Sequence, residues 1–331
     1  MKFQIRSEKM TNFQVYKKIL SFSLIEFLAS LALLLILAGI AVAGFFIGQN
    51  VYANGGGFVG AIIGLLVGAI LVGLASNYGL FLIKAAQISM ITEGVTKGEL
   101  PENTFKAGFA SIKSRFGALS LLFFVMSAIK AIFRQLGRGI NAIGTAIGGN
   151  TGNSVTSVID GIIQTLIAYL CDCCLGWVLY RKDQNAAKSA CEGCVIFFKH
   201  GKTLLKNAGR IFGMGALSFI VVGGAFFGAF YLLFAYPLLP AMDALYLELN
   251  KMVTDGLGFS STLFVVIAAA ISAIILWSTL HSVFVHPFIL TGVLRNYIES
   301  GVKDMPKESD FADLEAKAPK FSKLVAKANE K

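Results

Sequence analysis

Charged residues are scarce in this chain. Only 15% of its 331 residues are Asp, Glu, Lys or Arg, whereas 56% are hydrophobic and the mean hydropathy is +0.71. A water-soluble protein carries about a quarter of its residues as charged side chains, so this composition excludes a soluble globule. The 28 phenylalanines exclude a disordered chain, and the low count of five cysteines excludes a disulfide-stapled secreted scaffold. The composition predicts an integral membrane protein.

Catalytic sequence motifs are also lacking. The sequence contains no GxSxG, no P-loop and no HExxH, and no polar insertion is long enough to fold alone. We therefore expect neither an enzyme nor a bound cofactor. A lipid-modifying enzyme is the remaining catalytic alternative, although such chemistry normally uses more His, Asp and Glu at the membrane surface.

Six apolar stretches are long enough to cross a bilayer, for which a helix needs about 20 apolar residues. They cover residues 22–47, 58–83, 116–133, 155–179, 211–236 and 260–290. Unbroken apolar runs favour helices over barrel strands, in which apolar and polar residues alternate. The predicted fold class is all-α, a polytopic helical membrane protein with about six transmembrane helices. The predicted domains are a basic lead (1–21), a transmembrane domain (22–290) and a polar tail (291–331).

Lysine and arginine are concentrated in alternate connecting segments. The segments 1–21, 84–115, 180–210 and 291–331 contain 25 of the 29 Lys and Arg residues. Because cytoplasmic loops are enriched in cations, we predict that both termini are cytoplasmic. The net charge of +10 then favours anionic lipid headgroups as partners. Nucleic-acid binding is not expected, because no basic groove with interleaved aromatic residues is present.

Short sequence matches indicate an internal repeat. The tetrapeptide GALS at 117–120 recurs at 215–218, and ITEGVTK at 91–97 resembles IESGVK at 298–303. Three units of like build would give three parallel hairpins, since each enters the membrane from the same side. Each unit begins with a basic amphipathic segment that we predict to be a helix in the headgroup plane. Chance recurrence and solvated linkers are the alternatives.

Glycine recurs at every fourth position of the second apolar stretch, at Gly56, Gly60, Gly64 and Gly68. Such a stripe allows two helix backbones to approach closely within lipid. The partner helix could belong to the same chain or to a second copy, so a homo-oligomer is one interpretation. The glycine-rich segment 137–153 is predicted to be a flexible outer loop, with a re-entrant segment as the alternative.

Two ionisable residues within the predicted spans are candidates for a substrate or proton-relay site, because charged groups in hydrocarbon are costly. Asp172 and His281 lie at similar depth on the fourth and sixth stretches. A carboxylate beside an imidazole can relay a proton or hold a cationic solute. Asn77 could line the same cavity, and Glu26 is either part of a site or an anchor that reaches the interface.

A second pair of charges is predicted to be structural. Lys130 and Asp160 lie at similar outer depth on the third and fourth stretches. An ion pair between them would neutralise two charges that are each costly alone.

The five cysteines invite comparison with a zinc site. Cys171, Cys173 and Cys174 end the fourth stretch, and Cys191 and Cys194 form a CxxC after it. We expect no metal, because a zinc–thiolate centre would lie partly within the membrane. Free thiols are the favoured interpretation and acylation is an alternative.

The order of three segments resembles a known family. The cysteines at 171–174 precede a basic LLKN at 204–207 with Arg210, and an acidic exit, YIE, follows at 297–299. This arrangement resembles the choline-transporter-like family of multipass membrane proteins. The resemblance implies transport of a small solute and assigns no residue roles.

Together these features predict an integral membrane protein that binds or translocates a small solute or lipid. The alternative is a non-transporting scaffold that organises the membrane through its interfacial helices and glycine faces.

Overall fold

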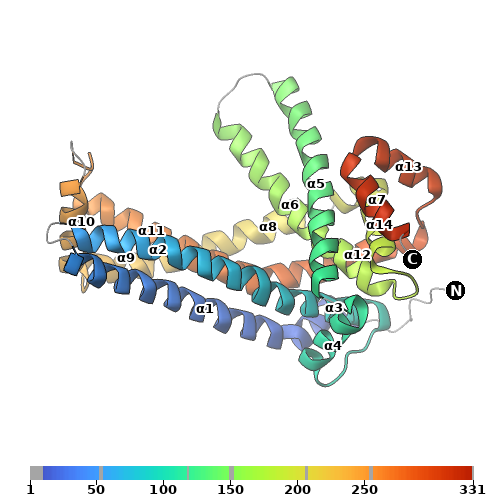
Figure 1. The fold of residues 1–331 in the computed structure, drawn as a ribbon, viewed down its shortest axis with the longest axis horizontal. Helices are drawn as coiled ribbons and strands as arrows, with labels where there is room; N and C mark the ends of the chain where they lie inside the picture. The colour runs from blue at the N-terminus through green and yellow to red at the C-terminus, as the bar shows by residue number, and fades with distance from the viewer. Residues whose placement is uncertain are drawn as a thin grey trace. The chain divides into compact units, whose positions relative to one another are not determined.

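The structure, a computed structural model, describes residues 10–51, 55–117, 119–148, 153–205, 208–252 and 256–329. Within these ranges the chain is helical and contains no strand, which confirms the predicted all-α class (Figure 1). The helices and π-helical turns are, in order, α1 (Asn12–Val51), α2 (Gly56–Ala75), η1 (Ser76–Leu80), α3 (Phe81–Lys97), α4 (Thr104–Phe116), α5 (Leu119–Gly148), α6 (Asn153–Tyr180), α7 (Ala186–Leu205), α8 (Ala208–Ser218), η2 (Phe219–Gly223), α9 (Gly224–Ala235), α10 (Leu239–Met252), α11 (Ser261–Leu280), η3 (His281–Val285), α12 (His286–Lys303), α13 (Glu308–Lys317) and α14 (Pro319–Asn329).

The chain forms two compact units, each assembled from separate stretches of sequence. Unit 1 contains residues 1–22, 83–212 and 287–331, and unit 2 contains residues 23–82 and 213–286. Unit 2 includes only one of the 29 Lys and Arg residues, Lys251. The division therefore separates an almost uncharged part of the sequence from the part that carries the cations.

Unit 2 exposes large apolar side chains along its helices. Leu35, Ile70 and Ile220 are 65%, 64% and 70% exposed. Hydrating apolar surface costs about 25 cal/mol per Å², and contiguous exposed apolar faces of this kind mark contact with lipid or another apolar partner. The protein is an integral membrane protein on this evidence.

Four helical segments in the described part of the chain are long and apolar enough to cross a membrane. They are Asn12–Val51, Gly56–Lys97, Ile211–Ala235 and Ser261–Lys303. They include four of the six predicted stretches, and three of them continue well beyond the predicted ends as unbroken helices. The basic segment 84–115 is therefore not simply a loop, since its first part is helix α3.

The third and fourth predicted spans differ from the other four. At the third, α4 ends at Phe116 and Gly117 has φ +61°, a backbone conformation that suits glycine. The segment Ser120–Gln135 then continues at 83° to α4, and the pair counts as a fifth span only if the bend is disregarded. At the fourth, the apolar part is the shorter helix Gln164–Tyr180. Its residues 171–179 are buried inside unit 1 by protein.

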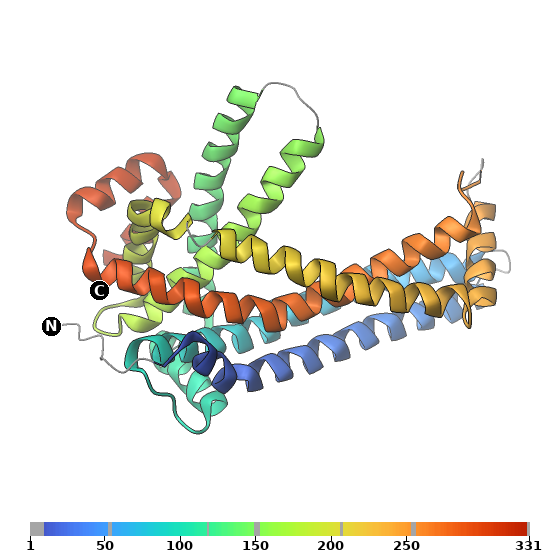
Figure 2. The ribbon, with the colours of Figure 1, turned by 180° about the vertical axis from the view of Figure 1, so that it is seen from behind.

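Helices α9 and α11 of unit 2 lie side by side, as Figure 2 shows in yellow and orange. Each long segment here contains a π-helical turn: η2 precedes α9 and η3 follows α11. Such turns widen a helix by one residue and are frequent at functional sites. They draw attention to the ends of these two helices.

The core of unit 1 is formed by helices that flank α6. Trp177, Tyr169 and Tyr297 are among its largest fully buried side chains, and α6 packs against α5 and α7. Trp177 Nε1 donates a hydrogen bond to Glu192 Oε2 at 3.1 Å. The Tyr297 hydroxyl donates to the Gly193 carbonyl, so Trp177 and Tyr297 both have hydrogen-bond partners inside this unit.

The segment predicted as a polar tail is folded. It forms the end of α12 and two further helices, α13 and α14. Leu314, Phe321 and Leu324 are fully buried, because α14 packs on α7 and α5 and α13 packs on α7. These three apolar side chains of the tail therefore lie in the core of unit 1.

The prediction of a loop at 137–153 is wrong for most of that segment. Helix α5 continues to Gly148, and α6 begins at Asn153. Alanine and isoleucine between the glycines sustain the helix, so the described part of the segment is helical and not a loop. Residues 149–152 lie outside the described part of the chain.

The basic leads pack on protein within unit 1. Val15, Ile19 and Phe22 of α1 are fully buried, and Phe22 contacts Phe105 of α4 with ring centroids 5.1 Å apart. Phe13 of the same helix is 64% exposed. The buried face of the first lead is thus the one that carries Val15, Ile19 and Phe22.

Candidate binding site

Asp172 and His281, which were predicted to share a site, have separate surroundings. Asp172 lies on α6 in unit 1, whereas His281 begins η3 in unit 2. Each has its own partner: Asp172 pairs with Lys84, and His281 contacts Ser218. The hypothesis of a shared proton relay gains no support from these contacts.

The Asp172–Lys84 ion pair joins α6 to α3. Lys84 Nζ lies 2.9 Å from Asp172 Oδ2, and the side chains are 33% and 8% exposed. A buried carboxylate is costly unless it is paired, and Lys84 neutralises it. Matched depth along the sequence pointed to His281 because Lys84 was assigned to a loop. The continuation of the second span into α3 is what brings Lys84 into reach.

His281 forms a polar cluster with Ser218 and Trp277, where α8 and α11 end. His281 Nδ1 lies 3.0 Å from Ser218 Oγ, and Trp277 Nε1 donates to the same oxygen at 3.2 Å. Ser218 Oγ donates to the carbonyl of Gly215 at 2.8 Å. The Trp277 and His281 rings are 5.4 Å apart. Ser218 and Trp277 were missed because neither is ionisable, although Ser218 belongs to the repeated GALS.

The hydrogen-bond inventory of Ser218 favours one imidazole tautomer. A hydroxyl has one proton and two lone pairs. Its proton goes to the Gly215 carbonyl, and the Trp277 N–H uses one lone pair. All three contacts are satisfied together only when His281 Nδ1–H donates to the other lone pair. In the neutral ring, Nε2 then carries a lone pair and can only accept.

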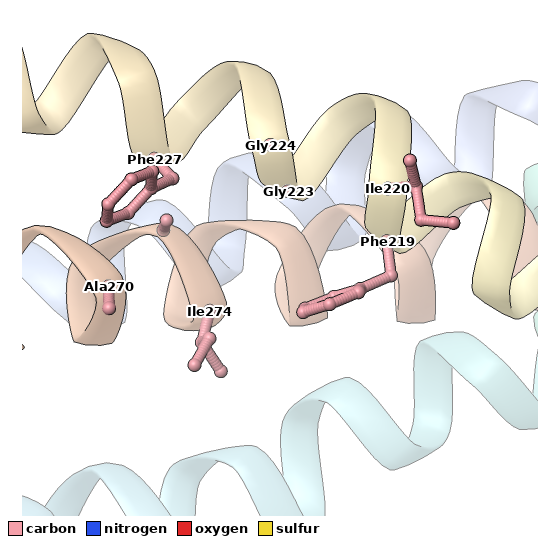
Figure 3. A pocket seen from close by; sticks show the side chains of 8 residues that line it. Phe219, Ile220, Gly223, Gly224, Phe227, Ala270 and Ile274 are labelled. Carbon is pink, nitrogen blue, oxygen red and sulfur yellow. The ribbon is translucent and has the colours of Figure 1, made fainter.

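An apolar groove of about 260 Å³ lies beside this cluster, between the η2–α9 segment and α11. Figure 3 shows Phe219 and Phe227 on one helix and Ala270 and Ile274 on the other, with Gly223 and Gly224 between the two aromatic residues. The Phe219 ring contacts Trp277 edge to face, with centroids 4.9 Å apart. The Phe219 and Trp277 rings thus lie between the groove and His281.

The remaining candidates from the sequence do not line this groove. Glu26 is buried on α1 and Asn77 is exposed on η1. Lys130 is exposed on α5. The side chain of Asp160 lies outside the described part of the chain, so the predicted Lys130–Asp160 pair remains a prediction.

The glycine stripe of α2 lies against α1 of the same chain. A Cβ added at Gly60 would lie 2.9 Å from Gly48 Cα, and one added at Gly64 would lie 2.6 Å from the Ile40 carbonyl oxygen. Gly56 approaches the backbone of Gly48 in the same way, and Gly68 faces Leu37. The close contact that the stripe predicts is therefore made within the chain. A groove of about 420 Å³ with apolar walls lies along this contact.

All five cysteines are free and buried in unit 1. Burial raises the pKa of the Cys191 thiol, so this side chain stays protonated and apolar at neutral pH. Within the described residues, no group of three or more His, Cys, Asp or Glu side chains is placed to hold a metal ion. The cysteines act here as small apolar residues that pack α6 on α7.

Two arginines that the sequence did not single out join α4, α6 and α7. Arg115 donates to the carbonyls of Val178 and Gln184 at 2.8 and 2.7 Å. Arg181 pairs with Asp183 and Glu192, each at 2.9 Å. Its guanidinium lowers the pKa of Asp183 below the ordinary value. These contacts stabilise unit 1.

No protein family, curated protein or solved structure that was compared with this chain matches it.

Proposed function

We propose that this integral membrane protein binds an amphiphilic lipid, or a small lipid-like solute, in the groove between α9 and α11. The observation that carries this proposal is the position of an apolar groove next to the polar Ser218–Trp277–His281 cluster. Ligand sites typically combine apolar walls with a few polar groups that orient the ligand. This combination suits a molecule with an apolar body and a polar head.

The depth of the cluster supports an amphiphile as the ligand. Helix α11 has 20 residues from Ser261 to Leu280, which is about 30 Å at 1.5 Å per residue. The hydrocarbon core of a bilayer is also about 30 Å thick. His281 follows α11 directly, so it lies where hydrocarbon gives way to headgroups.

The scarcity of charges in unit 2 favours an amphiphile over a polar solute. Unit 2 contains only five Asp, Glu, Lys or Arg residues: Glu26, Asp243, Glu248, Lys251 and Asp255. A path for a polar solute needs polar or ionisable groups facing it. The choline-transporter-like resemblance would instead favour a small cationic solute, and a quaternary amine is therefore the appropriate competitor in the test below.

We propose a topology with four spans, with unit 2 in the membrane and the basic segments of unit 1 on the cytoplasmic side. Four helical segments meet the length and hydropathy that crossing requires, and both termini are then cytoplasmic. This arrangement places 28 of the 29 Lys and Arg residues on the cytoplasmic side, in keeping with the positive-inside rule. Anionic lipid headgroups are then the natural partners of that face.

A non-transporting scaffold remains the second candidate. The backbone contact between α1 and α2 and the broad exposed apolar faces would serve that role without a ligand. If the protein is a scaffold, filling the groove with a larger side chain should not change how strongly a photoreactive lipid labels the protein.

The Gly224→Leu variant tests the binding proposal. Gly224 lines the groove, and a Cβ there would meet nothing within 4 Å, so leucine fills the groove without disturbing the packing. Gly228→Leu is the matched control, because Gly228 is equally open but does not line the groove. We expect Gly224→Leu to reduce cross-linking of a photoreactive lipid to α9 and α11 at least severalfold, as measured by mass spectrometry of the reconstituted protein. Equal labelling of both variants, or competition by a quaternary amine only, would contradict the proposal.

A further inference from the structure

The most specific polar feature near the groove is the open nitrogen of His281, which follows the groove-lining helix α11 directly. Its Nδ1 is engaged by Ser218, and no hydrogen bond to Nε2 is formed within the part of the chain that the structure describes. The imidazole is half-buried rather than enclosed. This nitrogen is therefore accessible to a group that comes from outside the protein.

The tautomer decides what that group must be. Because Nδ1 carries the proton, Nε2 of the neutral ring is an acceptor only and requires a donor from its partner. A hydroxyl satisfies this requirement. A phosphodiester, a carboxylate or an ester has acceptors alone, so each would face the Nε2 lone pair without a hydrogen bond.

The walls of the groove determine the chemistry of the ligand's body. The Phe219, Ile220 and Phe227 side chains, with Ala270, Ala273 and Ile274, present only carbon to the interior. The aromatic contact between Phe219 and Trp277 connects these walls to the imidazole. The ligand therefore needs an apolar body and, at the end of that body, a hydrogen-bond donor near the headgroup level.

From this geometry we infer that the groove is selective for a neutral lipid with a free hydroxyl head, which donates a hydrogen bond to His281 Nε2 while its apolar body lies between α9 and α11. The inference rests on the proposed function and adds the ligand class to it. Diacylglycerol is the simplest lipid of this class. Phosphatidylcholine with the same acyl chains is its natural counterpart, because its head has no donor.

The test compares two photoreactive, clickable probes on the full-length protein in nanodiscs of unlabelled phosphatidylcholine. One probe is diacylglycerol and the other is phosphatidylcholine with identical chains. A neutral hydrogen bond contributes about 0.5–1.5 kcal/mol, so we expect the diacylglycerol probe to label the groove about two- to tenfold more strongly. This comparison uses the unmodified protein and does not depend on the folding of any variant.

Variants then assign the preference to the imidazole. His281→Phe keeps an aromatic ring and removes the acceptor, so it should equalise the two probes while groove labelling persists. Ser278→Ala is the matched control, since the Ser278 hydroxyl is exposed and donates to the Ile275 carbonyl of its own helix; the preference should persist there.

The possible outcomes separate the two proposals. Equal labelling of the groove by both probes, with labelling still lost in Gly224→Leu, would overturn the hydroxyl preference and leave lipid binding intact. A preference for a fatty-acid probe would require a proton on Nε2 and would also overturn the inference. Labelling that Gly224→Leu does not change would remove the binding site itself and both proposals with it.

Discussion

At Gly60 a hydrogen atom stands where any other residue has a carbon, and the contact between α1 and α2 depends on this difference. An added Cβ would lie 2.9 Å from Gly48 Cα and 3.0 Å from the Gly44 carbonyl carbon. Both atoms belong to backbone, which cannot rotate away as a side chain can. The α1–α2 contact is close because glycines on both helices face one another.

We therefore predict opposite effects for two alanine substitutions in α2. Gly60→Ala should destabilise the protein by about 1–3 kcal/mol, the usual cost of overpacking. Gly73→Ala should be neutral or stabilising by up to about 1 kcal/mol, because nothing lies within 4 Å of an added Cβ there and alanine favours a helix. Thermal unfolding of the purified protein in detergent measures both. Equal shifts in the two variants would show that α1 and α2 do not approach as described.

Individual residues were only partly predictable from the sequence. The glycine stripe was visible because its spacing of four is a property of one helix. The partners of Asp172 and His281 were not visible, because Lys84 is 88 residues from Asp172 and Ser218 is 63 residues from His281. Depth along a span restricts which residues can meet, but it does not determine which helices are neighbours.

The long helices show why the ends of a helix were harder to predict than its presence. The second and sixth apolar stretches continue as α3 and α12 without a break. Hydropathy falls at the end of each stretch, yet residues such as Thr92 and Thr291 are buried there and donate to carbonyls of their own helix. The apolar run ends where protein replaces lipid around the helix, but the helix itself continues.

The same two segments have matching lengths. Helices α2 and α11 each have 20 residues, a five-residue π-helical turn follows each, and α3 and α12 then have 17 and 18 residues. A duplication of sequence would produce such matching lengths. The internal repeat itself stays a prediction.

The C-terminal helices are held by apolar burial and by an ion-pair cluster. Lys199 pairs with Asp304 at 2.8 Å and Asp310 at 3.1 Å. The hydrogen bond from Lys199 lowers the pKa of Asp304, and the Lys307 backbone N–H, followed by Lys199, lowers that of Asp310. These side chains are 21% to 44% exposed, and ion pairs that solvent can reach contribute little. The buried side chains of α14 therefore provide most of the attachment.

We predict that Leu324→Ala releases α14 from α7 and α5. Leu324 is fully buried, and truncation of a buried leucine costs about 2–5 kcal/mol, which exceeds what exposed ion pairs supply. Limited proteolysis should then cleave the tail faster, at sites after Lys317 and Lys320. Lys323→Ala is the control, because this neighbouring side chain is exposed and its loss should leave the cleavage rate unchanged. Unaltered cleavage in Leu324→Ala would mean that α14 is not docked through this face.

For the molecule as a whole, the membrane class was predictable and the number of spans was not. Composition identifies the class because only a chain with few charged residues can expose long segments to lipid. The number of spans stays a prediction, because a run of apolar residues has the same sequence whether lipid or protein covers it. Residues 171–179 illustrate the ambiguity: they formed part of a predicted span, and the structure buries them inside unit 1.

The four-span and six-span topologies assign opposite sides to the connection between α5 and α6. With four spans this connection is cytoplasmic, together with Arg134 and Arg138; with six it is external.

We expect an epitope tag inserted at 149–152 to bind antibody only after the cells are permeabilised, as a tag at the C-terminus should. A tag at 52–54 is external in both topologies and should bind antibody in intact cells. The positive-inside rule favours this outcome, because an external connection would place two arginines on the cation-poor side. Antibody binding to the 149–152 tag in intact cells would establish that α5 and α6 cross the membrane. The cytoplasmic side would then carry the 25 Lys and Arg residues of the four basic segments, instead of 28.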